Sequence, residues 1–62
     1  MPHIDRLSAQ EAANYLGCHR DTIYKLARQR EIPHWHIGRT LCFSRASLEK
    51  WKHDQEVESI AN

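Results

Sequence analysis

Side chains that can bind anions are concentrated in the middle of this 62-residue chain. Residues 19–45 hold six basic residues against two acidic ones, a net charge of +4, whereas the whole chain has a formal net charge of +1. The basic residues are Arg20, Lys25, Arg28, Arg30, Arg39 and Arg45. The flanking stretches, 1–18 and 46–62, carry −1 and −2. Such a segregated basic region is typical of a surface that binds a polyanion, although solvated basic faces are also common.

The residue types alone are also compatible with metal binding and with catalysis. A period-two pattern puts His34, His36 and Cys42 on one face of a predicted hairpin, where they could be zinc ligands. No fourth ligand is evident, and structural zinc sites usually contain paired cysteines, so no metal site is predicted. Ser, His and Asp residues are present, but no motif places a nucleophile beside a base or an oxyanion hole. The chain is therefore predicted to be a binding module, not an enzyme, with no cofactor and no small-molecule substrate.

Composition indicates one small domain. With 40% hydrophobic and 27% charged residues, the chain is near the lower size limit for unaided folding and has little room for a buried catalytic pocket. No apolar run approaches the roughly 18 residues of a membrane span, and the opening Met1–Asp5 does not resemble a signal peptide. Cys18 and Cys42 form no paired-cysteine pattern, so reduced thiols are expected. These features predict a cytoplasmic protein without a membrane partner.

The first half of the chain is predicted to contain two helices joined by a tight turn. Ser8-Ala9-Gln10-Glu11 has the form of a capping box, and apolar residues at helical spacing predict a helix over 9–16. Gly17 supplies the left-handed residue that often ends a helix. A second helix should begin after His19 and fade near Arg30. Two helices joined by so short a turn must cross steeply, which requires small residues such as Ala13 and Cys18 between them.

From Ile32 onward the hydrophobic period changes to two, which predicts a hairpin with its turn at Gly38-Arg39-Thr40. Ser44 then resembles the N-cap of a third helix. The large apolar residues predicted to face the core are Trp35, Ile37, Leu41, Phe43, Leu48 and Trp51. The order helix, turn, helix, hairpin, helix is that of a winged helix-turn-helix, a mostly α fold with a small β-hairpin.

The helical pattern weakens after His53. Residues 54–62 are polar and acidic and are expected to fray, although Val57 and Ile60 could extend the helix if something covers them. The predicted organisation is a single domain over residues 1–62, with its core in 7–53 and an acidic tail in 54–62.

Five stretches resemble the excisionase family of small winged helix-turn-helix proteins, which is related to the DNA-binding domains of mercury-resistance regulators. The resemblance covers residues 7–51. The stretches are Leu7-Ser8-Ala9-Gln10-Glu11-Ala12-Ala13-Asn14-Tyr15-Leu16-Gly17, Asp21-Thr22-Ile23-Tyr24-Lys25-Leu26, Ile32-Pro33, Ile37-Gly38-Arg39 and Ser44-Arg45-Ala46-Ser47-Leu48-Glu49-Lys50-Trp51. The resemblance implies sequence-selective binding of duplex DNA by several copies in a row, with the second helix in the major groove and the wing at the adjacent minor groove.

Two positions depart from the family pattern. His19 stands where the family commonly has a serine cap for the second helix, which should weaken the cap. His36 stands on the wing where a basic residue is usual, which removes a permanent charge and makes altered affinity or pH dependence an expectation.

Candidate DNA contacts follow from the helical wheel of the second helix, drawn with Ile23 inward at about 100° per residue. Arginine and lysine suit base edges and phosphates, and hydroxyls suit phosphates. The predicted contacts on this helix are His19, Arg20, Asp21, Thr22, Tyr24, Lys25 and Arg28. Asp21 either accepts a hydrogen bond from a cytosine amino group or complements the helix dipole and pairs with Lys25.

The predicted contacts outside this helix are His36, Arg39 and Thr40 on the wing and Arg45 at the start of the third helix. Arg39, at the hairpin tip, suits the minor groove or the DNA backbone. Arg45 carries a positive charge at the unfavourable end of a helix dipole, so a phosphate partner would explain its position.

The predicted function is that of an excisionase-type architectural factor. Such a protein binds double-stranded DNA next to a recombination site, bends it cooperatively with other copies, and promotes excision by a tyrosine or serine integrase. The protein would be bacterial or phage-encoded and associated with the nucleoid. The alternatives are a small phage or plasmid transcriptional regulator, the DNA-recognition domain of a larger protein and, from a different class, a winged helix that binds another protein.

Overall fold

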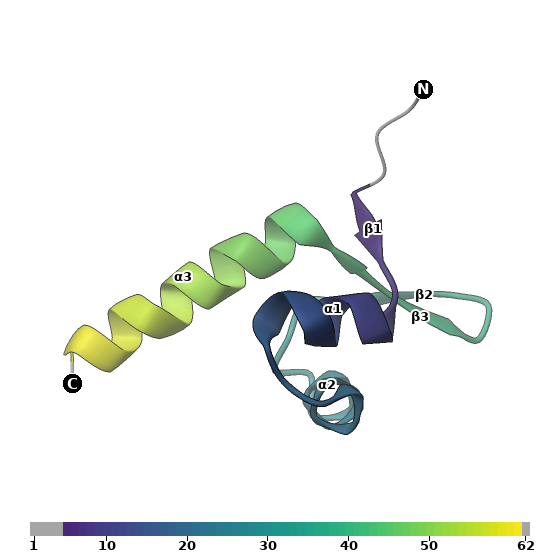
Figure 1. Cartoon of the computed structure of the whole chain (residues 1–62), viewed down its shortest axis with the longest axis horizontal. Coiled ribbons are helices and arrows are strands. Elements are labelled where there is room, and N and C mark those ends of the chain that lie inside the picture. The colour runs from purple at the N-terminus through teal and green to yellow at the C-terminus, as the bar shows by residue number, and fades with distance from the viewer. Residues whose placement is uncertain (1–4, 62) are drawn as a thin grey trace.

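A computed structural model describes residues 5–61 and shows three helices and a small antiparallel sheet, consistent with the predicted winged helix-turn-helix (Figure 1). The elements are β1 (Arg6–Leu7), α1 (Ala9–Leu16), α2 (Arg20–Arg28), β2 (Trp35–Ile37), β3 (Thr40–Ser44) and α3 (Arg45–Ala61). Residues 1–4, part of the opening for which no signal peptide is predicted, and Asn62, the end of the predicted tail, lie outside the described residues. None of the helices in 5–61 has the length and apolar character that crossing a membrane requires.

The predicted capping box begins α1. The Glu11 amide donates to Ser8 Oγ at 3.1 Å, and the Ser8 amide donates to Glu11 Oε1 at 2.8 Å. The helix ends at Gly17, whose φ of +75° suits a residue without a side chain. The amides of Gly17 and Cys18 both donate to the Ala13 carbonyl, at 2.8 and 3.0 Å. The predicted bounds of this helix are confirmed.

The second helix, α2, ends in a Schellman motif. The Arg30 amide donates to the Ala27 carbonyl at 3.0 Å, and the Glu31 amide donates to the Leu26 carbonyl at 2.9 Å. Arg30 has a φ of +59°, a conformation that glycine usually adopts at this place. The prediction that this helix fades near Arg30 is confirmed.

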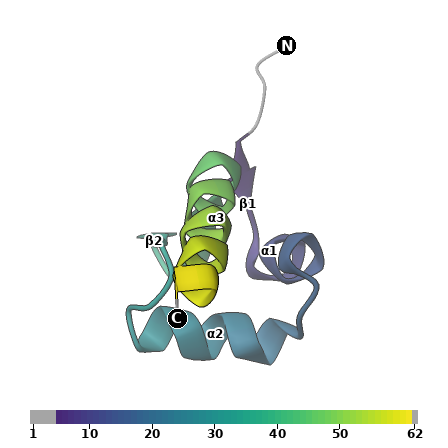
Figure 2. The same ribbon diagram turned by 90° about the vertical axis from the view of Figure 1, so that its left-hand side faces the viewer.

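The core lies where α1 and α2 cross beneath β3 and the start of α3. Ala12 and Ala13 on α1 and Ile23 on α2 have no exposed surface, because small side chains let the two helices approach closely. Figure 2 shows α1 nearly end-on while α2 runs across the view, so the helices cross steeply as predicted. The core cluster is Ala9, Ala12, Ala13, Ile23, Ala27, Ile32, Phe43 and Leu48.

The sheet has the strand order β1-β3-β2, with both pairings antiparallel. The strand β1 was not predicted, since its two residues are too few for a period-two pattern. It pairs Leu7 with Phe43 and Arg6 with Ser44, so β3 is the central strand, with β1 beside its last two residues and β2 beside its first three. Residues 6 and 7, ahead of α1, are therefore part of the sheet.

The predicted hairpin turn was one residue too long. Ile37 pairs with Thr40, so only Gly38 and Arg39 form the turn, and Gly38 has a φ of +61°. Glycine first in a two-residue turn is the residue pattern of a type II′ hairpin. Trp35 consequently pairs with Cys42.

This register reverses the faces of β2 relative to the prediction. Directly opposed residues share a face, so Trp35 and Ile37 lie on the face away from Leu41 and Phe43. Trp35 is 41% exposed and Ile37 is 53% exposed, so the prediction that both face the core was wrong. Cys42 is buried.

The first turn of α3 is capped by two side chains. Ser44 Oγ accepts from the Ser47 amide at 3.2 Å, as expected of the predicted N-cap, and donates to Asp5 Oδ2 at 2.6 Å. Asp5 Oδ1 accepts from the Ala46 amide at 3.2 Å, and the Asp5 carbonyl accepts from the Arg45 amide at 2.9 Å. Residues about 40 positions apart in the sequence are thus tied together at the helix start.

The helix α3 packs on the core only through its first half. Leu48 is fully buried, and Trp51 packs against the core cluster and donates from Nε1 to the Glu31 carbonyl at 2.8 Å. The helix continues to Ala61, well past His53, and projects from the body (Figure 1). The side chains from 52 to 60 are all exposed. The expected tail is therefore helical in the described residues.

The cap at α3 gives a stability prediction. Replacing Asp5 with alanine removes acceptors for the Ala46 amide and the Ser44 hydroxyl, so we expect a loss of about 1–2 kcal/mol in the free energy of unfolding. Urea denaturation followed by circular dichroism measures it. Asp54→Ala is the control, because Asp54 makes only an exposed ion pair with Lys50 at 3.4 Å. That change should cost less than about 0.5 kcal/mol, and equal losses in the two variants would contradict the capping role of Asp5.

Candidate nucleic-acid interface

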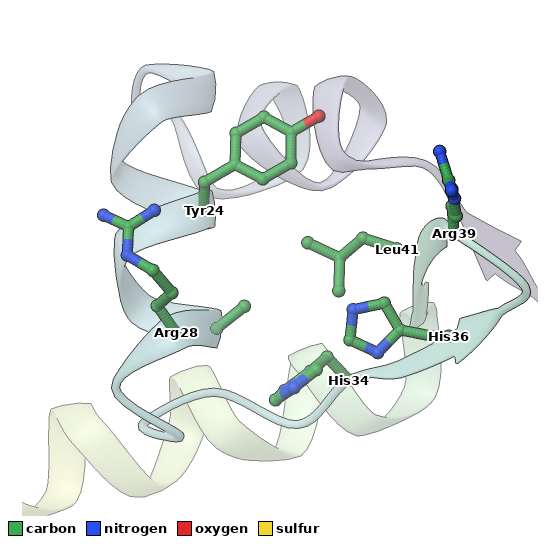
Figure 3. Close-up of a pocket in the computed structure, with 7 residues that line it drawn as sticks. Tyr24, Arg28, His34, His36, Arg39 and Leu41 are labelled. Atoms are coloured by element: carbon green, nitrogen blue, oxygen red, sulfur yellow. The ribbon is translucent and has the colours of Figure 1, made fainter.

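A groove separates α2 from the wing, the β2–β3 hairpin. It consists of two hollows that share Tyr24, Arg39 and Leu41. The first, shown in Figure 3, is lined by Tyr24, Ala27, Arg28, His34, His36, Arg39 and Leu41. The second extends to the start of α1 and is lined by Ser8, Ala9, Gln10, Arg20, Tyr24, Arg39, Thr40 and Leu41. We call the two together the α2–wing groove.

Helical spacing accounts for the α2 side of this groove. Arg20, Tyr24 and Arg28 are four residues apart and form one stripe along the helix, next to the buried stripe of Ile23 and Ala27. The three side chains are exposed, and in Figure 3 Tyr24 lies on the hairpin side of α2 while the Arg28 side chain extends along the helix, away from the hairpin. The register of the hairpin accounts for the other side, because it turns His36 toward the groove together with Leu41.

The lining of the α2–wing groove carries positive charge and no carboxylate. Arg20 and Arg28 contribute from α2 and Arg39 from the turn, and two histidines can add charge when protonated. Ala27, which is buried, and Leu41, which is half-buried, add apolar atoms to the lining. A concave surface with charge of one sign strengthens the local electric potential, which favours a polyanionic ligand.

The structure brings six of the predicted DNA contacts together in the groove: Arg20, Tyr24, Arg28, His36, Arg39 and Thr40. The remaining predicted contacts on α2 do not line it. They are His19, Asp21, Thr22 and Lys25, which are exposed along the rest of the helix surface. The predicted contacts of α2 thus fall into two sets. One set forms a wall of the groove, and the other forms an exposed ridge along the rest of the helix surface.

His19 caps α2, although it is not the serine usual in the resembling family. Its Nδ1 accepts from the Asp21 amide at 3.0 Å. The same nitrogen lies 3.7 Å from Asp21 Oδ2. Since Nδ1 is the acceptor in the cap, His19 is neutral in this arrangement and carries its proton on Nε2.

Asp21 is the acidic residue in the first turn of α2, as the helix-dipole interpretation expects. Its predicted pairing with Lys25 is not found, because among residues 5–61 the carboxylate of Asp21 lies beside His19. The base-contact interpretation of Asp21 stays a prediction.

Arg45 has a partner within the protein. Its guanidinium lies over the ring of Tyr15, with the carbon of the group 5.3 Å from the ring centroid, a cation–π geometry. It begins α3, which Figures 1 and 2 show on the side of the body away from α2. A phosphate is therefore not needed to explain this arginine, and Arg45 does not line the α2–wing groove.

One groove residue, His34, is absent from the predicted DNA contacts. Sequence reasoning grouped it with His36 and Cys42 on one face, but the observed register puts Cys42 opposite Trp35 and on the other face. The grouping considered for zinc is therefore wrong, and no cluster of three or more possible ligands occurs within residues 5–61. The correct turn length would have revealed that His34 and His36 face α2.

Comparison with known families identifies this architecture. The model of a helix-turn-helix domain family matches residues 6–56, which is most of the chain. The chain belongs to this helix-turn-helix domain family. The family includes excisionase-like DNA-binding domains, and membership indicates DNA as a partner. Domains of this family are typically binding modules and not enzymes. No curated protein matches the chain, and no solved structure matches it.

For this helix-turn-helix domain, the position of Arg39 at the wing tip predicts a sequence-independent role. Arg39→Ala should weaken binding to every duplex, because a backbone or minor-groove contact does not depend on base identity at one position. A plot of the logarithm of affinity against the logarithm of salt concentration should become shallower by about 1. Fluorescence anisotropy with a labelled random duplex measures both effects.

Lys52→Ala is the control for Arg39→Ala. Lys52 is an exposed cation on α3 and does not line the groove, so the variant loses the same charge without losing the proposed contact. If the two variants lowered the salt slope equally, Arg39 would act only through net charge.

Proposed function

We propose that this helix-turn-helix domain is an excisionase-type architectural factor that binds duplex DNA beside a recombination site. Bound copies bend the DNA and direct a tyrosine or serine integrase toward excision. The protein acts in the cytoplasm, on bacterial or phage DNA in the nucleoid. The mechanism is binding and shaping of DNA, with no chemical step.

The observation that carries this proposal is the carboxylate-free α2–wing groove beside the exposed ridge of α2. An α-helix fits the major groove of B-DNA, where arginine and lysine recognise guanine edges. With α2 in the major groove, the wing reaches the neighbouring backbone and minor groove, where arginine is favoured by a narrow groove width. Resemblance to the excisionase family at five stretches supports the finer assignment.

We expect about four to six phosphate contacts per copy, of which the four basic residues of α2 and the wing, Arg20, Lys25, Arg28 and Arg39, account for four. By the usual counterion-release relation, that predicts a slope of about −4 to −5 in a plot of log affinity against log salt. A single copy then binds weakly at physiological salt, and several adjacent copies gain affinity through contacts with one another.

Two exposed apolar surfaces can provide contacts between neighbouring copies. Ile37 is next to the wing tip and is 53% exposed, while Val57 and Ile60 on α3 are 49% and 85% exposed. The wing is the nearer of the two to the DNA in the proposed orientation. The acidic end of α3 is better suited to contact with a different protein. It is the surface expected to bind a protein partner if the chain does not bind DNA.

Substitutions on α2 test the recognition role. Arg20→Ala or Lys25→Ala should weaken binding to the preferred site by about 1–3 kcal/mol and leave much of the binding to random DNA intact. Anisotropy titrations with the two duplexes at equal salt measure the difference. Lys52→Ala serves again as the control. Unchanged affinity for the preferred site in both α2 variants would mean that another face reads the DNA.

Cooperation and bending test the excisionase assignment. The full-length protein is titrated on labelled duplexes taken from the DNA beside its own reading frame, with one or several binding sites, and the end-to-end distance is followed by energy transfer. We expect steeper binding and a shorter distance on the multi-site duplex, and Ile37→Ser should reduce the steepness without affecting the one-site duplex. An excision assay with the integrase encoded nearby completes the test.

The outcomes separate the alternatives. Tight one-site binding without cooperation or bending would favour a transcriptional regulator or the recognition domain of a larger protein. Absence of salt-dependent binding to any duplex would overturn DNA binding and favour the protein-interaction alternative, with the acidic end of α3 as the surface to examine.

A further inference from the structure

Two histidines face the same part of the α2–wing groove. The rings of His34 and His36 are 5.7 Å apart between centroids and meet edge to face at 86°. Both line the first hollow together with Tyr24 and Arg28 of α2 and Arg39 of the turn, and in Figure 3 the two guanidinium groups extend away from the imidazole rings. The lining of the hollow therefore has two groups that can gain charge and two arginines that always carry it.

The hydrogen bonding of His34 determines what this side chain can bind. Its Nδ1 lies 2.8 Å from the Ile32 carbonyl oxygen. A carbonyl oxygen only accepts hydrogen bonds, so Nδ1 carries the proton and donates it. In the neutral ring the other nitrogen, Nε2, then has only a lone pair, which cannot bind a phosphate oxygen. Protonation converts Nε2 into a charged donor, so His34 can bind an anion only in its imidazolium form.

Among residues 5–61, those that line the two hollows beside these histidines include no carboxylate that would neutralise such a charge. The residues that line the hollow beside the histidines include Tyr24 and Arg28 of α2, Arg39 of the turn and Leu41 of β3. A shallow hollow on the other side of His34 adds Ser47 from α3 together with Pro33, Trp35 and Ser44, all without formal charge. Phe43 lies 6.4 Å from the His34 ring, centroid to centroid. Two imidazolium ions in this place would repel each other and the arginines unless an anion lay between them.

We propose that His34 and His36, with Arg28 and Arg39, form a proton-dependent site for one phosphodiester group of the DNA backbone. This inference rests on the proposed DNA binding and assigns His34 a contact that sequence reasoning did not give it. Binding of DNA takes up protons at the two histidines, and the affinity for DNA of any sequence depends on pH.

The direction of the dependence follows from the charged form being the one that binds. A free imidazole titrates near pH 6.5, and a phosphate that binds imidazolium more tightly than the neutral ring extends the charged form to higher pH in the complex. The gain in affinity is therefore complete below about pH 6.5 and is lost as the pH rises. If the phosphate binds the imidazolium form of each ring about tenfold more tightly than the neutral form, each histidine contributes about tenfold in affinity between pH 8.5 and 5.5.

The experiment measures anisotropy of a labelled 20-base-pair random duplex with the full chain at pH 5.5, 6.5, 7.5 and 8.5 and at several salt concentrations. The variants are His34→Asn, His36→Gln and the double variant. Asparagine at position 34 keeps a donor for the Ile32 carbonyl and removes Nε2, so the local hydrogen bond is retained. Thermal unfolding checks each variant, and His36→Gln, at an exposed position, carries the test if His34→Asn is unstable.

Two further variants serve as controls for other titrating histidines. His53→Gln removes an exposed histidine of α3 outside the groove. His19→Ser replaces the N-cap of α2, whose Nδ1 loses its acceptor role on protonation, with a cap that does not titrate.

We expect wild type, His53→Gln and His19→Ser to gain about 100-fold in affinity from pH 8.5 to 5.5, with a salt slope that is steeper at pH 5.5 by about 1. In His34→Asn and in His36→Gln the gain should be about tenfold smaller than in the wild type. The double variant should bind with little dependence on pH. At pH 8.5 His53→Gln should bind like the wild type, and the gain of every other variant is measured relative to its own affinity at that pH.

Two results would overturn the inference while leaving DNA binding intact. One is a double variant that keeps the pH dependence of the wild type. The other is a pH dependence that disappears in His19→Ser, which would assign the proton to the cap of α2. Absence of salt-dependent binding at every pH would instead overturn the proposed function together with this site.

Discussion

The pairing of Ile37 with Thr40 across a two-residue turn is the constraint on which the candidate interface depends. A strand alternates its side chains between two faces, so one residue more or less in the turn would exchange the faces of β2 relative to β3. With the observed register, Phe43 enters the core while His34 and His36 face α2. The same register leaves Trp35 and Ile37 on the outer face. One turn residue thus decides whether the wing presents histidines or large apolar groups to α2.

The position of the wing depends in turn on how β3 is held. The first three residues of the strand pair with β2 and its last two pair with β1, and its end leads directly into α3, where Asp5 and Ser44 bond to the first turn. Phe43 and Leu48, on either side of this junction, are fully buried against the crossing of α1 and α2. The helix α2 packs on that same core through Ile23 and Ala27. The two sides of the groove, α2 and the wing, are therefore held in place by one hydrophobic core.

Local signals predicted α1, α2 and the start of α3 well, but not the length of α3, and they predicted the sheet poorly. The capping box at Ser8 and the glycine after α1 act within a few residues, so the sequence alone reveals them. The two-residue strand β1 and the role of Asp5 depend on partners about 40 residues away, and no local pattern encodes such a contact. The hairpin faces were misassigned because Gly38 suits a two-residue or a three-residue turn, and only the pairing decides between them. Basic residues of the site were predictable by type and helical spacing, whereas His34 required the correct register.

The distribution of charge explains how a chain of net charge +1 can present a basic interface. Asp54, Glu56 and Glu58 are exposed and lie on the part of α3 that projects from the body (Figure 1). The wing tip with Arg39 lies at the other end of the longest dimension, which is 39 Å. At physiological ionic strength, exposed charges are screened over about 8 Å. The acidic helix end therefore lowers the net charge without neutralising the potential at the wing tip, and the total charge is a poor guide to what this surface attracts.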